Sequence, residues 1–236
     1  DVEVVAEFFP KFGAPDFSTE ISRPQALRPD VILSTSWGGD LDTFVRQAAQ
    51  RGLTNSSTLV LPLAESSLQR LGSALPAGHI VGGRGDHYFL HPEKVDDPEF
   101  TAFVEAFEEK TGAYPIYPVF HISQALAAFK KAYETAMEAN GGDWPSDEQV
   151  VEAMTGLTFS GLGREVTIRE DGQGLEDQLL GTTVTSDEYD FAILDNIMIF
   201  DAEDITTPIG QESLEWIGTL GPDLIDNVDV DTYAAE

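Results

Sequence analysis

Three short turns carry the residues whose chemistry suits the binding of a small molecule. Each turn follows a predicted strand, and together they contain the seven candidate ligand-binding residues Trp37, Gly38, Glu65, Ser66, Asp86, His87 and Tyr88. An indole ring can stack on an apolar group, a carboxylate can receive an ammonium, and the backbone N–H groups that open a helix can hold an anion. These turns are therefore the first place to look for a binding site.

Trp37 and Glu65 also have structural interpretations. A large aromatic residue at a strand end serves either ligand stacking or core packing, although two glycines follow Trp37 and would let the backbone approach a ligand closely. Glu65 receives a ligand ammonium only if it faces a cleft, and an exposed glutamate is otherwise solvated. Asp40 and Ser66 are typical helix-capping residues, and we expect Asp40 to cap the helix that follows Gly38-Gly39.

The sequence offers no group of residues suited to catalysis. It has no cysteine and no Gly-x-Ser-x-Gly elbow, and Gly161-Leu162-Gly163 lacks the context of a phosphate-binding loop. His87 and His91 are four residues apart, but Pro92 argues against the helix that a zinc site on this pair would need. We therefore predict a protein that is not an enzyme and has no metal or cofactor.

The candidate turns belong to a repeated strand–helix unit. Short apolar, β-branched runs alternate with stretches of helical period such as Leu41–Gln50, in which Leu41, Phe44, Val45 and Ala48 are apolar. The predicted strands are Val2–Phe9, Val31–Trp37, Thr58–Leu63 and His79–Gly83. This spacing is near the roughly 30 residues of a βαβ unit, and predicts an α/β fold with a parallel sheet. Turns after parallel strands meet at one edge, so we expect the three turns to share a cleft.

Helix boundaries are marked by capping residues. Gly52 is expected to end the helix that begins near Asp40, and Asp97-Pro98 and Gly112 bracket another helix. A long amphipathic helix is predicted over roughly Ser123–Glu138, after the stiff Tyr114–Pro118 segment. Ser146 and Gln149 form a capping-box pattern ahead of a short helix.

The last third of the chain predicts further strands. Glu165–Arg169 alternates with period two, Asp171-Gly172 is a turn signal, and Leu179–Val184 is expected to return as the partner strand of a hairpin. Phe191–Phe200 predicts one or two more strands, followed by an acidic tail.

The charge balance excludes nucleic-acid binding. Lys and Arg total 13 against 42 Asp and Glu, which gives a formal net charge of −29 and a pI near 4.1. Such a polyanion would be repelled by phosphates. The spread of acidic residues favours a surface adapted to high salt, and the alternative is an acidic extracytoplasmic protein from an ordinary habitat.

No apolar run approaches the roughly 20 residues that span a bilayer. The N-terminal residues predict a chain that has been processed or cut from a longer one.

One stretch resembles a known family. Residues Asp16–Leu53 read DFSTEISRPQALRPDVILSTSWGGDLDTFVRQAAQRGL. They resemble the type I periplasmic-binding-protein family, specifically the substrate-binding proteins of branched-chain amino-acid ABC uptake systems. The resemblance continues more weakly through Pro98–Pro115, Gln124–Ala136 and Val166–Arg169.

The resemblance implies a two-lobed, extracytoplasmic protein that closes on a small solute and delivers it to an ABC permease. Residues 1–113 would belong to the second lobe, 114–190 would cross to the first, and 191–236 would return. The chain would begin inside the second lobe, without most of the first lobe and the export signal, and membrane contact would come only through a missing N-terminal anchor or the permease.

The resemblance also assigns roles to two of the candidate residues. In relatives with leucine-like ligands an aromatic at the position of Trp37 contacts the ligand, and an acid after the next strand, nearest here to Glu65, receives its ammonium. The solute would be an amino acid or a related amide. A sensory or regulatory ligand-binding domain on the same fold is the alternative.

Overall fold

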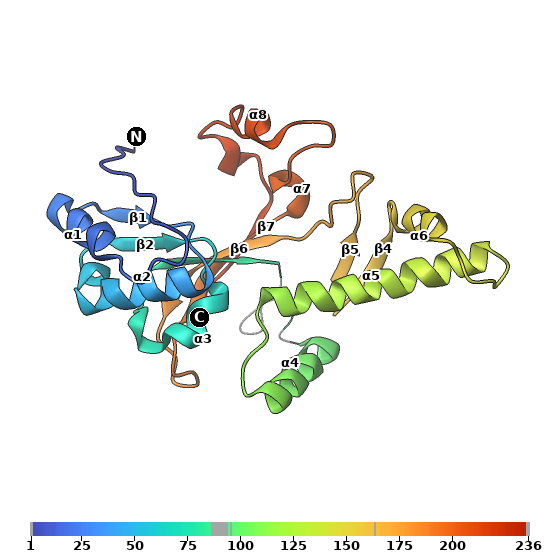
Figure 1. Cartoon of the computed structure of the whole chain (residues 1–236), viewed down its shortest axis with the longest axis horizontal. Helices are drawn as coiled ribbons and strands as arrows, with labels where there is room; N and C mark the ends of the chain where they lie inside the picture. Colours follow the sequence, from blue (N-terminus) through green and yellow to red (C-terminus); the bar gives the residue numbers. More distant parts are fainter. Residues whose placement is uncertain (1, 86–93, 95, 163, 235–236) are drawn as a thin grey trace. The chain divides into compact units, whose positions relative to one another are not determined.

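The structure is a computed structural model of the whole chain, and it describes residues 2–85, 94, 96–162 and 164–234 (Figure 1). The chain forms two compact units. Unit 1 consists of Asp1–Arg84, Leu179–Met198 and Thr232–Glu236, and unit 2 of Gly85–Gln178 and Ile199–Asp231. Each unit is therefore assembled from segments that are far apart in the sequence.

A six-stranded sheet has the strand order β1-β2-β3-β6-β7-β8. Its strands are β1 (Val31–Leu33), β2 (Thr58–Leu61), β3 (Ile80–Arg84), β6 (Gln178–Val184), β7 (Ile193–Phe200) and β8 (Val230–Tyr233). The first three are parallel, with Val31 opposite Thr58 and Val60 opposite Ile80. The predicted parallel arrangement of these strands is confirmed, and it places the turns after β1 and β2 at one edge of the sheet.

The predicted first strand, Val2–Phe9, is wrong. Residues 2–10 form no strand, and Val2 and Val4 are 94% and 71% exposed. β1 is the edge strand of the described sheet, and this segment pairs neither with the free side of β1 nor with another described strand. An apolar, β-branched run becomes a strand only when its backbone groups pair with a neighbouring strand.

The strand predicted to pair with Glu165–Arg169 in a hairpin, Leu179–Val184, is also the wrong partner. Glu165 lies in β5 (Arg164–Thr167), which pairs antiparallel with β4 (Thr158–Gly161), whereas β6 joins the large sheet beside β3. Backbone hydrogen bonds join residue 79 to 183 and residue 85 to 177, so β6 runs antiparallel to β3. Period-two alternation identifies a strand, but it does not name the neighbour of that strand.

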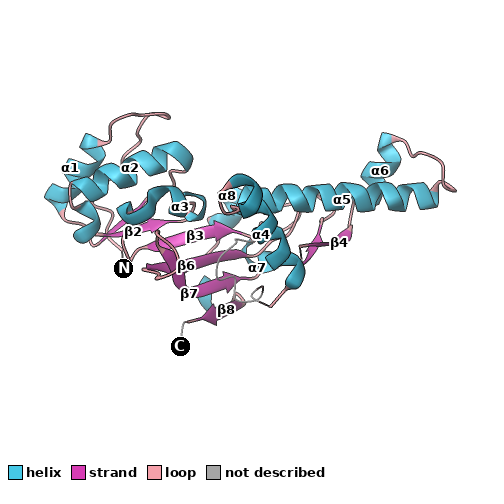
Figure 2. Ribbon diagram, turned by 90° about the horizontal axis from the view of Figure 1, so that it is seen from below, coloured by secondary structure: helices cyan, strands magenta, loops and turns pink. Residues whose placement is uncertain are grey.

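The helices of unit 1 lie over one face of this sheet (Figure 2). They are α1 (Ser18–Leu27), α2 (Gly38–Gln50) and α3 (Leu68–Leu71), with short 3₁₀ turns at Leu53–Asn55, Glu65–Ser67 and Gly72–Ala74. α2 buries Leu41, Phe44, Val45 and Ala48, the predicted apolar face. Burial of a Leu, Val or Phe side chain stabilises the fold by about 1.5–3 kcal/mol, so this face fixes α2 on the sheet. Gly52 follows α2 with φ of 73°, as predicted.

Unit 2 contains the remaining helices. These are α4 (Pro98–Thr111), α5 (Tyr117–Ala139), α6 (Asp147–Met154), α7 (Ala202–Ile205) and α8 (Ser213–Ile217), with a 3₁₀ turn at Leu224–Asp226. The capping predictions for α4 and α6 are confirmed: Asp97 accepts hydrogen bonds from two N–H groups of α4, Gly112 ends α4 with φ of 69°, and Ser146 and Gln149 form a reciprocal capping box. α5 starts six residues before its predicted start, since Pro118 fits the first turn of a helix.

Small residues let α5 pack closely against its neighbours in unit 2. Ala128 contacts the core of the β4–β5 hairpin, which includes Phe159 and Val166. Ala132 and Ala136 pack against Val150 of α6. The described residues contain no helix with the length and apolar content to cross a bilayer.

Candidate functional site

Trp37 ends the turn between β1 and α2 and is 61% exposed. Its backbone is extended, and Gly38 begins α2 with φ of 57°. Left-handed backbone at that position favours glycine over any residue with a Cβ atom. The exposure of the indole excludes core packing as the role of Trp37 within the described residues, and leaves its ring available to contact a ligand.

Asp40 has a different role from the one predicted. α2 begins at Gly38, so Asp40 is the third residue of the helix and does not cap it. Its Oδ2 atom instead accepts a hydrogen bond from the backbone N–H of Gly13 at 2.9 Å. The capping prediction is wrong because α2 begins at Gly38, three residues before the start at Leu41 that a cap at Asp40 implies. Asp40 instead holds the loop around Gly13.

Glu65 is a buried carboxyl group rather than a solvated surface residue. It opens the 3₁₀ turn after β2, and it is 2% exposed. A Cβ atom built on Gly83 would lie 3.5 Å from the Cβ of Glu65, so the Glu65 side chain starts against the end of β3. A carboxyl group in such a position interacts strongly with any cation that reaches it, because water screens it little. Ser66 follows it and is partly exposed.

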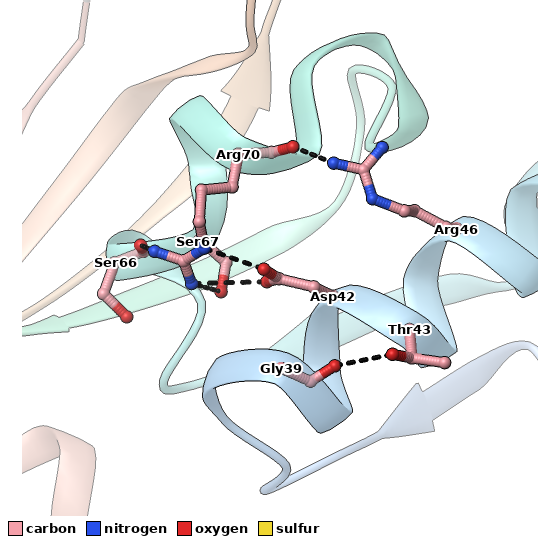
Figure 3. Close-up of polar contacts among 7 residues, drawn as sticks. All are labelled: Gly39, Asp42, Thr43, Arg46, Ser66, Ser67 and Arg70. Atoms are coloured by element: carbon pink, nitrogen blue, oxygen red, sulfur yellow. Dashed lines mark hydrogen bonds and ion pairs between the residues drawn. The ribbon is translucent and has the colours of Figure 1, made fainter. Parts of the chain in front are cut away.

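Arg70 joins the turn that carries Glu65 to α2 (Figure 3). Its Nε donates to Asp42 Oδ2 at 2.7 Å, its Nη1 to the Ser66 carbonyl at 2.5 Å and its Nη2 to Ser67 Oγ at 2.9 Å. Arg46 of α2 in turn donates to the Arg70 carbonyl. This network fixes the turn after β2 relative to the helix that begins beside Trp37.

The third candidate turn is only partly described. Asp86, His87 and Tyr88 lie outside the described residues, as does His91 of the histidine pair. Trp37, Gly38, Glu65 and Ser66 all lie in unit 1, after the carboxyl ends of the neighbouring strands β1 and β2. The structure thus brings four of the seven candidate residues to one edge of one sheet.

Two groups near this edge were not identified from the sequence. Phe12 is 87% exposed, and its ring centroid lies 6.3 Å from that of Trp37 at an interplanar angle of 43°. The Arg70–Asp42 ion pair was also missed, because its members are 28 residues apart. No local pattern marks either contact, and only the parallel βα arrangement could have suggested that helix α2 meets the turn after β2.

A polar cavity of about 350 Å³ lies elsewhere, in unit 2. Arg169, Asp171, Gln173, Thr207 and Gln211 are among the residues that line it, and none of the candidate site residues does. Arg169 is already paired with Asp171 and donates to the Thr207 carbonyl at 2.9 Å. Across the part of the chain that the structure describes, no cluster of three His, Asp or Glu side chains suits a metal ion.

Several solved structures with the same fold are solute-binding proteins of ABC transporters or amino-acid-binding proteins. An amino-acid ABC transporter substrate-binding protein from Pseudomonas fluorescens Pf-5 is 24% identical with a TM-score of 0.62, covering 83% of this chain and 51% of its own. A leucine-binding protein from Thermotoga maritima is 22% identical with a TM-score of 0.60, covering 80% and 50%. A solute-binding protein of an R. palustris ABC transporter, in complex with benzoate, is 18% identical with a TM-score of 0.61, covering 81% and 49%.

These likenesses show a shared fold, and the chain spans about half the length of each of these structures. No curated protein matches the chain. The family described as periplasmic binding protein matches residues 1–188, which is most of the sequence. Together with the parallel β1–β3 sheet, this match confirms the resemblance seen in Asp16–Leu53: the chain belongs to the periplasmic binding protein family, with the type I fold.

Proposed function

We propose that this chain is part of an extracytoplasmic solute-binding protein that serves an ABC importer. The observation that carries the proposal is the placement of an exposed Trp37 and a buried Glu65 after two neighbouring parallel strands. Ligands of open α/β sheets bind outside the carboxyl ends of the strands, where these two residues lie. The family match and the structural relatives, which are ABC-transporter substrate-binding and leucine-binding proteins, support the same function.

The proposed solute is an amino acid with an apolar side chain. The indole of Trp37 offers a face to the apolar part, and the carboxylate of Glu65 offers a counter-charge to an ammonium. Benzoate, the ligand named for the R. palustris relative, carries a negative charge and no ammonium. The buried Glu65 and the net charge of −29 both disfavour such an anion here.

Transport would depend on closure of two lobes around the solute, and the assignment of residues to lobes is part of the proposal. A ligand shifts the equilibrium toward the closed state by the difference between its affinities for the closed and open states. The permease would then recognise the closed surface. No step of this cycle requires catalysis by the protein.

The proposal is tested by calorimetric titration of the full-length protein with L-leucine, L-phenylalanine and benzoate. We expect the amino acids to bind and benzoate to bind far more weakly. Trp37→Ala is expected to weaken amino-acid binding by about 1–3 kcal/mol, the usual effect of removing an aromatic contact. Trp144→Ala is the matched control, because Trp144 is 74% exposed and lies in unit 2. Equal binding by the wild type and Trp37→Ala would contradict the placement of the site.

A further inference from the structure

The loop at residues 11–14 holds a second aromatic ring against Trp37. Phe12 is 87% exposed and Trp37 61%, and their ring centroids are 6.3 Å apart. Isolated exposed aromatic residues are common on protein surfaces. Two that touch one another beside a candidate ligand site form a larger apolar surface that gains free energy when an apolar group covers it.

This loop is attached to the same helix that Trp37 precedes. The Gly13 N–H donates to Asp40 Oδ2 at 2.9 Å, and the turn closes with a bond from the Ala14 N–H to the Lys11 carbonyl at 3.1 Å. Gly13 has φ of 73°, a left-handed conformation in which glycine is favoured. Asp40 therefore fixes the loop at the residue next to Phe12.

A second attachment, at Gln47, lies about two turns further along α2. Gln47 accepts a hydrogen bond from the Phe17 N–H at 2.8 Å and donates to the Pro15 carbonyl at 3.0 Å. With Asp40, this gives the segment from residue 13 to 17 three hydrogen bonds to side chains of one helix. Phe12 and Trp37 are thus positioned by a common element, and their relative placement is a built feature of unit 1.

The geometry of the two rings restricts how a ligand can use them. A planar group stacked between two rings needs a centroid separation of about 7 Å, twice the usual contact distance. The observed 6.3 Å with a 43° angle leaves no room for such a sandwich. The two rings form a corner instead, onto which one branched or aromatic group can pack and touch both.

We propose that Phe12 is a second ligand-contacting residue and sets the specificity of the site for large apolar side chains. This inference rests on the proposed function, since it assigns Phe12 to the site that contains Trp37. A solute with a short side chain would contact the corner little. A leucine-like or phenylalanine-like side chain would cover both rings.

The test compares Phe12→Ala with the wild type in titrations of the full-length protein with L-leucine, L-phenylalanine and L-alanine. We expect Phe12→Ala to bind L-leucine and L-phenylalanine about tenfold or more weakly, as for a lost aromatic contact, and L-alanine with nearly unchanged affinity. Phe9→Ala is the matched control, because Phe9 is 90% exposed and three residues away. It should bind all three amino acids like the wild type.

Thermal melting of the ligand-free protein separates a ligand contact from a structural one. If Phe12 contacts only ligand, Phe12→Ala and the wild type melt at the same temperature without ligand. A variant that melts several degrees lower would show that polypeptide covers Phe12, and that result overturns the inference, as does unchanged leucine affinity. Failure of the wild type to bind any of the three amino acids would instead contradict the proposed function and the role of Phe12 together.

Discussion

The guanidinium of Arg70 donates hydrogen bonds to both carboxylate oxygens of Asp42, with Nε–Oδ2 and Nη2–Oδ1 distances of 2.7 and 3.4 Å. The pair joins α2 to the turn that opens with Glu65, and the same guanidinium reaches the Ser66 carbonyl. Arg70 is 47% exposed and Asp42 17% exposed, so solvent screens the ion pair in part. Arg70 stabilises the turn mainly because its one planar guanidinium makes several hydrogen bonds at once.

Replacement of Arg70 is expected to loosen this turn. Arg70→Ala should lower the free energy of unfolding by about 1–2 kcal/mol, because it removes several hydrogen bonds at a partly exposed site. Arg70→Lys should recover only part of the loss, since an ammonium cannot reproduce the fork-shaped contact. Urea unfolding measures both. Lys130→Ala, at a side chain that is 77% exposed, is the control and should change stability little. Full recovery by lysine would show that charge alone matters.

Gly82 is expected to tolerate no side chain. A Cβ atom there would lie 2.6 Å from the Pro62 carbonyl oxygen and 2.9 Å from Pro62 Cα, both backbone atoms. Gly82→Ala should therefore destabilise the protein by about 1–3 kcal/mol, the usual effect of overpacking. Gly39→Ala is the control, because its Cβ would meet nothing within 4 Å in the first turn of α2. We expect a neutral or slightly stabilising effect there, measured by urea unfolding.

His79 makes stability depend on pH. It is 3% exposed, its Nδ1 accepts the Leu59 N–H at 3.2 Å, and burial lowers its pKa below the ordinary value of 6.5. Below pH 6.5 the His79 side chain is protonated in the unfolded chain but stays neutral in the folded one, and this difference favours unfolding. The contribution of His79 to stability is therefore present above pH 6.5 and is lost as the pH falls.

Comparison of the wild type with His79→Asn isolates this effect. Asparagine can place an acceptor oxygen near the Leu59 N–H but does not titrate in this range. The free energy of unfolding of the wild type should fall more steeply between about pH 7.5 and 5 than that of the variant. Parallel curves for the two proteins would assign the acid sensitivity to other groups.

The acidic surface predicts stabilisation by salt. With a net charge of −29, carboxylates repel one another in dilute buffer, and molar salt shortens the range of that repulsion to about 3 Å. We expect the melting temperature to rise by several degrees between dilute buffer and molar KCl. Sucrose at matched osmolarity is the control for general exclusion effects. A melting temperature that does not change with KCl would contradict adaptation to high salt.

Local sequence signals predicted much of this fold. The apolar face of α2, the caps at Asp97 and Ser146 and the parallel strands β1–β3 follow from residue types within a few positions of one another. The errors come from pairings that such signals do not contain. Residues 2–9 have strand composition but pair with no described strand, and β6 has strand alternation but lies beside β3 and not beside β5.

Some residues of the candidate site could also be predicted from local sequence signals, and others could not. Trp37 and Glu65 could be placed at one edge because strand order fixes where their turns emerge, although the burial of Glu65 was not predictable. Phe12 could not be assigned, since its contact with Trp37 depends on a loop held by Asp40 and Gln47 from a later helix. Asp40 was predicted to cap α2 because the sequence alone does not show that Gly38 adopts φ of 57° and begins the helix.

The discontinuous composition of unit 1 has a consequence for biosynthesis. Its sheet needs β6 and β7, which emerge from the ribosome roughly a hundred residues after β3. Contacts this distant in sequence slow folding and leave sheet edges exposed meanwhile. The residues of unit 1 up to Arg84 therefore cannot complete their sheet until β6 and β7 have been synthesised.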